Sequence, residues 1–208
     1  MIGRHGRGAA KTIFTPPAKL LIKLGVSPNW VTVVGALATS AVALTLFPLG
    51  YLWPGALALG ALVLVDALDG TMARLAGSET KWGGFLDSTL DRVSDAAIFG
   101  GLIIYLVRQH DTWGAVAGIV ALGLGAVVPY ARAKAEALGL IATIGIAERG
   151  DRLLVALTTA GVVGLGAPRL VLTISLALLG VASAVTVCQR AYVVYRQSKN
   201  APEATGAK

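Results

Sequence analysis

Long apolar stretches separated by short polar or charged segments run along most of this chain. The first of them holds no charged residue between Leu24 and Val65, which is room for two membrane crossings of about 20 residues each. Glycine, proline and clustered charges interrupt the later stretches. The pattern predicts an all-α integral membrane protein with six transmembrane helices, at about Trp30–Phe47, Leu52–Ala73, Phe85–Val107, Trp113–Leu138, Leu153–Leu165 and Leu170–Tyr195. The fifth stretch is short, so we expect that helix to begin earlier than drawn.

The two ends of the chain differ from this core. Residues 18–26 read AKLLIKLGV, in which leucines share the segment with Lys19 and Lys23; this is typical of an amphipathic helix lying at the membrane interface. The first 27 residues contain Pro16-Pro17 and no small-residue cleavage site, so we do not expect a signal peptide. We divide the chain into an N-terminal arm with a juxtamembrane amphipathic helix (1–27), a six-helix domain (28–197) and a polar tail (198–208).

Composition supports a membrane protein and suggests its orientation. Only 14% of the residues are charged, 55% are hydrophobic and the mean hydropathy is +0.73, whereas soluble domains carry about 25% charged residues. The net charge of +7 is therefore expected to mark cytoplasmic loops near anionic headgroups rather than binding of nucleic acid. Only Arg108 and Arg169 fall near the opposite face, so we expect both termini on the cytoplasmic side. A single cysteine, Cys188, excludes an internal disulfide.

Four aspartates lie inside the second and third predicted helices. Asp66 and Asp69 are three residues apart and Asp87 and Asp91 are four apart, so each pair shares one helical face. A short connection joins the two helices, which makes them antiparallel neighbours with their acidic ends at one level. The sequence therefore predicts that the four carboxylates converge on one point.

A carboxylate within a bilayer segment costs about 2.5–3.5 kcal/mol and needs a partner or a purpose. A hard divalent cation with oxygen ligands would relieve the repulsion between the four, Mg²⁺ being usual where phosphates complete the shell; two ions are plausible. The alternative is a set of ion pairs with Arg74, Lys81 and Arg92, which would explain only one or two of the acids. Asp95, one further turn along, has no assigned role.

These residues resemble a known family signature. The pattern D-x2-D-G-x2-A-R-x8-G-x3-D-x3-D of the CDP-alcohol phosphotransferases is matched at every position by Asp66, Asp69, Gly70, Ala73, Arg74, Gly83, Asp87 and Asp91. The resemblance implies a six-helix membrane enzyme, usually a homodimer, with its site open to the cytoplasm. Such enzymes transfer a substituted phosphoryl group from a CDP-linked donor to an alcohol and release CMP.

The same resemblance implies roles for individual residues. It implies that two metal ions are held by Asp66, Asp69, Asp87 and Asp91, and that Asp91 is the general base for the acceptor hydroxyl. It also implies contacts to the CDP donor from Gly70, Arg74 and Thr80. The stretch SPNWVT, residues 27–32, resembles the family segment that opens the first helix, which makes Asn29 and Thr32 candidate donor-binding residues; read alone, it is equally typical of a helix start.

Basic residues cluster near the predicted cytoplasmic ends of the last three helices. They occur in PYARAKAEALG, AERGDRLLV and TVCQR as Arg132, Lys134, Arg149, Arg152 and Arg190. Each is consistent with positive-inside topology alone. Their number near an anion-handling site favours a phosphate pocket and hence an acceptor that bears its own phosphate, which leaves inositol phosphate and glycerol 3-phosphate.

The combination of these segments resembles the actinobacterial phosphatidylinositol-phosphate synthases over nearly the whole chain. That resemblance implies transfer from CDP-diacylglycerol to inositol phosphate in a bacterial plasma membrane. It implies that the acceptor phosphate is held by Arg132, Lys134, Arg152 and Arg190. A phosphatidylglycerol-phosphate synthase is the nearest alternative. A divalent-cation transporter is an alternative of another class, but it would require acids distributed across the membrane depth.

Overall fold

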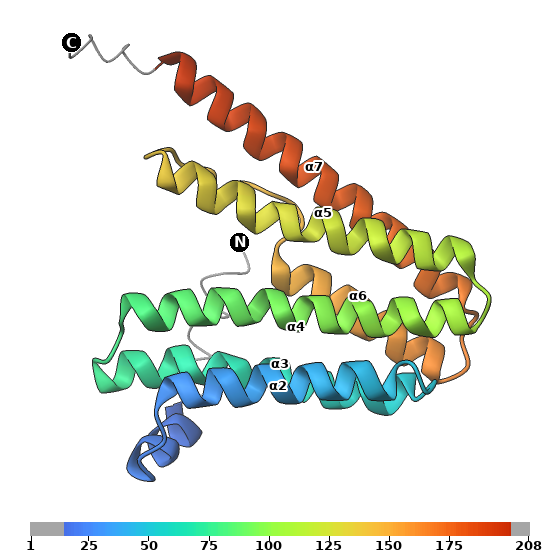
Figure 1. Cartoon of the computed structure of the whole chain (residues 1–208), viewed down its shortest axis with the longest axis horizontal. Coiled ribbons are helices and arrows are strands. Elements are labelled where there is room, and N and C mark those ends of the chain that lie inside the picture. The colour runs from blue at the N-terminus through green and yellow to red at the C-terminus, as the bar shows by residue number, and fades with distance from the viewer. Residues whose placement is uncertain (1–14, 201–208) are drawn as a thin grey trace.

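A computed structural model describes residues 15–200 of the chain, and within them it contains helices and no strands. A short helix over residues 15–23 precedes the helices labelled in Figure 1, which are α2 (Pro28–Leu46), α3 (Leu52–Ala76), α4 (Lys81–Arg108), α5 (Thr112–Ala137), α6 (Arg149–Gly164) and α7 (Leu170–Asn200). Helices α2, α3 and α4 run side by side, α5 packs along α7, and α6 lies between the two groups, against α3 and α7.

The connection between α3 and α4 is short, as the sequence predicts, and it is shorter than the interval 74–84 left between the two predicted helices. Gly77 ends α3 with a left-handed φ of 60°, where Ser78 N donates to Ala73 O at 3.0 Å, a glycine-based helix stop. Thr80 then caps α4 by accepting a hydrogen bond from Gly83 N at 2.9 Å. The acidic ends of the two helices are therefore held at one level by a four-residue turn.

The remaining helix bounds agree closely with the predicted ones, with one correction at the C-terminal end. Helix α6 begins at Arg149, before the predicted start, as expected for that short segment. Helix α7 continues to Asn200, so residues 198–200 belong to it and not to a polar tail. Ser198 Oγ donates to Val194 O at 2.9 Å, and Lys199 lies over the ring of Tyr195, which supports the last turn. The rest of the predicted tail and the first 14 residues of the arm lie outside the described residues.

Four helices of the described chain are long and apolar enough to cross a membrane, namely α2, α3, α5 and α7. Helix α4 carries Asp87, Asp91, Arg92 and Asp95 within its first 15 residues, and α6 has only 16 residues. Large apolar side chains cover the outer surface; Trp113 is 81% exposed and Leu154 68%. Exposed apolar area of this extent suits lipid rather than water, and the molecule is a multi-pass membrane protein.

Glycines let the helices approach at several crossings. A Cβ at Gly101 of α4 would lie 2.3 Å from Ala43 O of α2, and one at Gly164 of α6 would lie 2.3 Å from Trp53 N of α3. A Cβ at Gly114 or Gly118 of α5 would instead meet side chains, those of Thr173 of α7 and Ile103 of α4. Close backbone approach through small residues is how helices pack without a hydrophobic driving force between them.

Candidate active site

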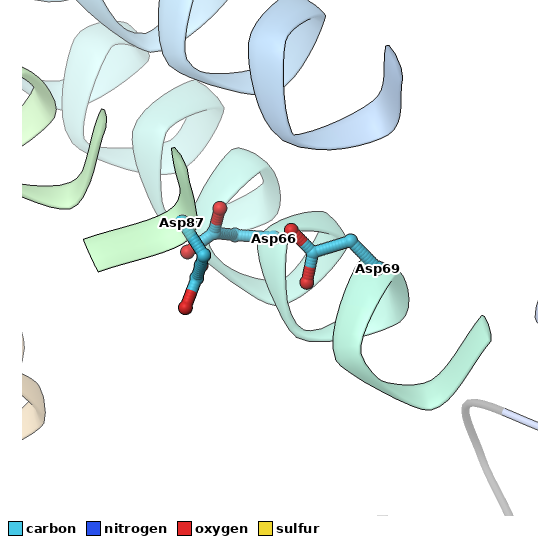
Figure 2. Close-up of side chains that lie close together, drawn as sticks. All are labelled: Asp66, Asp69 and Asp87. Atoms are coloured by element: carbon cyan, nitrogen blue, oxygen red, sulfur yellow. The ribbon is translucent and has the colours of Figure 1, made fainter. Parts of the chain in front are cut away.

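Three of the four signature aspartates meet between α3 and α4. Asp66 and Asp69 of α3 and Asp87 of α4 each place a carboxylate oxygen within 4.8 Å of the other two. Figure 2 shows the two α3 side chains on one face of that helix, with Asp87 reaching them from α4. Asp69 is the buried member, at 7% exposure. The helical spacing of the acids and the short α3–α4 turn account for this convergence.

The fourth aspartate, Asp91, reaches the cluster through an arginine rather than directly. Arg149 of α6 places Nη1 2.8 Å from Asp91 Oδ1 and 3.3 Å from Asp66 Oδ2. The guanidinium thus offsets part of the negative charge of the two carboxylates. The expectation that four acids meet at one point is therefore corrected. Three carboxylates converge, and the fourth is joined to them by Arg149.

The ion pairs of the acidic region are not the set that local spacing suggests. Of the three basic residues weighed as partners, Arg92 lies 3.6 Å from Asp91 and 3.9 Å from Asp95, while Arg74 donates to Thr71 Oγ1 at 3.3 Å. The closest partner of Asp91, Arg149, comes from α6, a helix distant in sequence. Its position in the basic segment at the start of that helix was the available signal, but nothing in the sequence pairs it with the acids.

The oxygen atoms that these aspartates offer are suited to binding a hard divalent cation. Three clustered carboxylates offer only oxygen atoms, the ligands that Mg²⁺, Ca²⁺ and Mn²⁺ prefer. Because the three lie so close, their negative charges repel one another strongly in a medium of low dielectric constant. A bound cation is the simplest way to offset that repulsion at Asp66, Asp69 and Asp87.

Both oxygens of Asp69 are held in place by hydrogen bonds. Thr32 Oγ1 of α2 donates to Oδ2 at 2.5 Å, and Gly70 N donates to Oδ1. Thr32 Oγ1 also lies 3.1 Å from Pro28 O, but a charged acceptor makes the stronger bond. Thr32, a predicted donor-binding residue, therefore orients a candidate metal ligand.

Replacing Thr32 with valine is expected to weaken metal binding. The variant keeps the shape of the side chain but leaves one oxygen of Asp69 without its donor, and losses of such outer hydrogen bonds cost about 10–100-fold in metal affinity. Titration of Mn²⁺ followed by electron paramagnetic resonance measures the change. Thr45→Val is the matched control, because Thr45 lies on the same helix and donates only to carbonyls of its own helix among its described hydrogen bonds; equal Mn²⁺ affinity in both variants would contradict the role of Thr32.

A cavity of about 430 Å³ opens beside the acids. Its walls include Asp69 and Asp87 together with all five predicted donor-binding residues, which are Asn29, Thr32, Gly70, Arg74 and Thr80. They come from the start of α2, the end of α3 and the start of α4. The predicted donor residues thus share one cavity with two of the predicted metal ligands.

The cavity is suited to an anion that approaches the backbone closely. The N-termini of α2 and α4 both border it, and their partial positive charge favours a negative group. A Cβ at Gly83 would lie 3.2 Å from both Asn29 Oδ1 and Thr80 Oγ1, so a larger residue would crowd this wall. Gly70 leaves open the space beneath the Arg74 guanidinium, whose nitrogens are 3.8 and 3.9 Å from where its Cβ would be.

The four predicted acceptor residues fall into two groups. Arg152 and Arg190 are each 3% exposed: Arg152 Nη2 lies 3.2 Å from Asp95 Oδ2, and Arg190 donates to Ile144 O and Val128 O at 2.8 and 2.5 Å. Arg132 forms an exposed pair with Glu136 at 2.8 Å, and Lys134 is exposed on the same helix. The structure thus buries two of the four and leaves two on the surface near the end of α5.

The segment between α5 and α6 is tied to α7 at three points. Thr186 Oγ1 accepts from Ile146 N and Ala147 N, and Gln197 exchanges two hydrogen bonds with the backbone of Ile141. Arg190 adds the bond to Ile144 O. The sequence carries no pattern that singles out Thr186 or Gln197, yet both hold the segment that borders the basic residues.

Replacing Gly125 with alanine is expected to displace Arg152. A Cβ there would lie 1.8 Å from Arg152 Nη1, and the buried guanidinium cannot move away without loosening its contact with Asp95. If Arg152 binds the acceptor, the KM for the acceptor rises about tenfold, the loss expected for one charged hydrogen bond. Steady-state kinetics with the acceptor varied measure it. Gly123→Ala on the same helix, with no atom within 4 Å of the added Cβ, should have the wild-type KM for the acceptor. A similar acceptor KM in Gly125→Ala and Gly123→Ala would contradict the prediction.

Comparison with known proteins identifies close relatives. Residues 25–147 match the family described as CDP-alcohol phosphatidyltransferase. The chain is 41% identical to a phosphatidylinositol phosphate synthase of Corynebacterium glutamicum over 192 residues, covering 91% of this chain and 87% of that protein. Identity to a phosphatidylinositol phosphate synthase of Streptomyces avermitilis is 40% over 215 residues, covering 100% of this chain and 88% of the relative.

Solved structures of a Mycobacterium tuberculosis phosphatidylinositol phosphate synthase have the same fold. The form with CDP-DAG bound has a TM-score of 0.85 at 39% identity, covering 95% of this chain and 98% of that one. The form in complex with manganese and citrate has a TM-score of 0.84, covering 94% and 93%.

Proposed function

The chain belongs to the CDP-alcohol phosphatidyltransferase family, and from that premise we propose that it transfers the phosphatidyl group of CDP-diacylglycerol to a hydroxyl of inositol phosphate, giving phosphatidylinositol phosphate and CMP. The observation that carries the proposal is about 40% identity to phosphatidylinositol phosphate synthases over 91–100% of the chain. Family membership identifies an enzyme and removes the ground for interpreting the acids as a cation-transport path.

The proposed reaction forms one bond and breaks another at a single phosphorus. The acceptor oxygen bonds to the phosphorus of the phosphatidyl group, the bond from that phosphorus to the CMP oxygen breaks, and the hydroxyl proton passes to a carboxylate. We assign the proton to Asp91, which is joined to the acidic cluster by Arg149, with Nη1 2.8 Å from Asp91 Oδ1. A positioned carboxylate is an effective general base for a weak oxygen nucleophile.

We assign the metal ligands to Asp66, Asp69, Asp87 and Asp91, with two Mg²⁺ ions as the physiological pair and Mn²⁺ as a substitute. When bound, the cations supply positive charge that favours departure of CMP. The manganese complex of the M. tuberculosis relative supports a divalent ion in this family. Asn29, Thr32, Gly70, Arg74 and Thr80 are assigned to the CDP-diacylglycerol donor, and Thr32 acts there through Asp69.

The acceptor phosphate is assigned to Arg132, Lys134, Arg152 and Arg190. The two buried arginines support this assignment, because their guanidinium groups are already ordered by fixed partners and lose little freedom on binding. The exposed pair would complete the site from the end of α5.

We further propose six membrane crossings, with both termini and the active site on the cytoplasmic side of a bacterial plasma membrane, in a homodimer. Helix α4 has 28 residues and so a length of about 42 Å, enough to span the hydrocarbon core. Arg169 Nη1 donates to Gln109 O at 2.6 Å, which supports a single opposite face carrying Arg108 and Arg169. The basic residues at the other end support its cytoplasmic orientation.

The test offers two acceptors separately. Purified protein in mixed micelles receives CDP-diacylglycerol with Mg²⁺ and either labelled inositol phosphate or labelled glycerol 3-phosphate, and CMP and labelled lipid are quantified. We expect CMP and labelled phosphatidylinositol phosphate from the first acceptor, with a much lower kcat/KM for the second. Labelled lipid from glycerol 3-phosphate alone would instead indicate a phosphatidylglycerol-phosphate synthase.

A further inference from the structure

Asp95 is a buried carboxylate outside the family signature. It lies one helical turn beyond Asp91 on α4 and is 5% exposed. Its two oxygens contact different arginines of α6: Oδ1 accepts from Arg149 Nε at 3.0 Å, and Oδ2 lies 3.2 Å from Arg152 Nη2. Arg92, whose side chain is 34% exposed, is more distant, at 3.9 Å.

The two arginines that Asp95 holds face different parts of the active site. Arg149 points a second nitrogen, Nη1, at Asp91 and Asp66, whereas Arg152 packs against Gly125 of α5. A continuous series of charged contacts therefore runs from the candidate metal ligands through Arg149 and Asp95 to Arg152, one of the predicted acceptor residues. No other described carboxylate contacts both arginines.

Burying one carboxylate between two guanidiniums is costly unless the geometry is good, and removing the carboxylate would leave two cations facing each other in a medium of low dielectric constant. The stability of the fold alone does not require that each carboxylate oxygen of Asp95 contact a different arginine. The division of the oxygens fixes the direction of both guanidiniums at once: that of Arg149 toward the base and that of Arg152 along α5.

We propose that Asp95 is a positioning residue for the phosphate-bearing acceptor: by holding Arg152 in the acceptor site and Arg149 beside Asp91, it places the acceptor phosphate and the proton-accepting carboxylate in one fixed arrangement. The proposal rests on the proposed function, because it needs an anionic acceptor at Arg152. It assigns Asp95 no contact with substrate.

The test compares Asp95→Asn and Asp95→Glu with the wild type. Binding of inositol phosphate, in the presence of Mn²⁺ and without donor, is measured by isothermal titration calorimetry, and KM and kcat are measured for each substrate. We expect Asp95→Asn to raise the Kd and KM for the acceptor about tenfold or more, while the KM for CDP-diacylglycerol changes less than about threefold. Asp95→Glu keeps the charge and should recover part of the acceptor affinity. If Asp95→Asn does not fold, Asp95→Glu is the variant in which the acceptor Kd and KM are compared with the wild type.

A double-mutant cycle with Arg152→Gln separates positioning from a general loss of stability. If Asp95 acts through Arg152, the double variant should have an acceptor Kd close to that of Arg152→Gln alone, because the second change removes a contact that is already lost. Asp111→Asn is the control, since Asp111 bonds to Gly114 and Thr173 at the other end of the bundle; it should change thermal stability without changing acceptor Kd.

The proposal is overturned if folded Asp95 variants bind the acceptor like the wild type, if the KM for the donor rises as much as that for the acceptor, or if the two substitutions act multiplicatively. Failure of the proposed function is visible separately, in the wild type: inositol phosphate would neither bind nor react. The same cycle is then run with glycerol 3-phosphate, where an unchanged acceptor Kd equally overturns the role of Asp95.

Discussion

Asp91→Asn is expected to lower kcat by about 10²–10⁴-fold, the usual contribution of a general base, while the Kd for CDP-diacylglycerol stays within about threefold of the wild-type value. Asparagine has nearly the same shape as aspartate but cannot take up the proton of the acceptor hydroxyl. The donor cavity does not include Asp91 among its walls, so donor binding should survive. Release of CMP measures turnover, and equilibrium binding of the donor in the absence of acceptor measures affinity.

The control for this variant is an aspartate of the same protein that is distant from the cavity. Asp111→Asn makes the same chemical change at the start of α5, where Asp111 Oδ1 accepts from Gly114 N at 2.8 Å; its kcat should be within about twofold of wild type, as for a substitution away from the reacting atoms. If Asp91→Asn retains wild-type kcat, Asp91 is not the base. A parallel loss of donor affinity would instead indicate that Asp91 mainly serves the metal site.

Removal of divalent cations with a chelator is expected to abolish turnover, and Mg²⁺ or Mn²⁺ should restore it. The physical reason is the clustering of Asp66, Asp69 and Asp87, whose oxygens lie within 4.8 Å and which would repel the donor diphosphate if left without a counter-charge. A ligand that binds the folded state also stabilises it by mass action, so added Mn²⁺ should raise the Tm. Turnover and thermal unfolding are followed on the same samples.

The matched comparison for metal removal is Asp69→Asn, which removes the charge of the buried member of the cluster. Its Tm should respond much less to Mn²⁺ than that of the wild type, while Asp111→Asn should respond fully. Full turnover after exhaustive chelation, or an equal Tm response in Asp69→Asn, would refute the assignment of these carboxylates to a metal.

The parts of the site that follow from local helical geometry were predictable from the sequence. Spacings of three and four residues place Asp66 with Asp69 and Asp87 with Asp91 on common faces, and a four-residue turn between α3 and α4 brings the two faces together. The same reasoning placed the ends of the helices within a few residues. These features depend on contacts between residues close in sequence, for which helical periodicity is a sufficient guide.

Contacts between distant helices were not predictable in this way. Spacing within α3 and α4 favours Arg74, Lys81 and Arg92 as partners of the acids, yet Arg149 of α6 lies closest to Asp91. Thr32 is another example: its motif indicates a donor contact or a helix start, whereas its hydroxyl bonds to Asp69, 37 residues away. Only the packing of α2 and α6 against the α3–α4 pair decides such partners.

The basic residues show a different limit of the sequence. Positive-inside topology and phosphate binding predict the same composition near the helix ends, so charge alone cannot separate them. Burial divides the basic residues in a way that charge does not: Arg152 and Arg190 are enclosed by the protein with fixed partners, whereas Arg132 pairs with Glu136 on the surface. The extension of α7 to Asn200 also places Arg190 well inside a helix rather than at its end.

The close helix crossings at Gly101 and Gly164 have a consequence for how this sequence can vary. At each position an added Cβ would meet backbone of a neighbouring helix at 2.3 Å, and backbone cannot move aside as a side chain can. In a saturation mutagenesis library, selected in cells whose growth depends on synthesis of the product lipid, these two glycines should therefore be as invariant as the signature aspartates. This is expected even though the two glycines lie among apolar side chains. Gly60 and Gly123, where a Cβ would meet nothing within 4 Å, should accept alanine, so the library would separate glycines constrained by helix approach from glycines with open space around them.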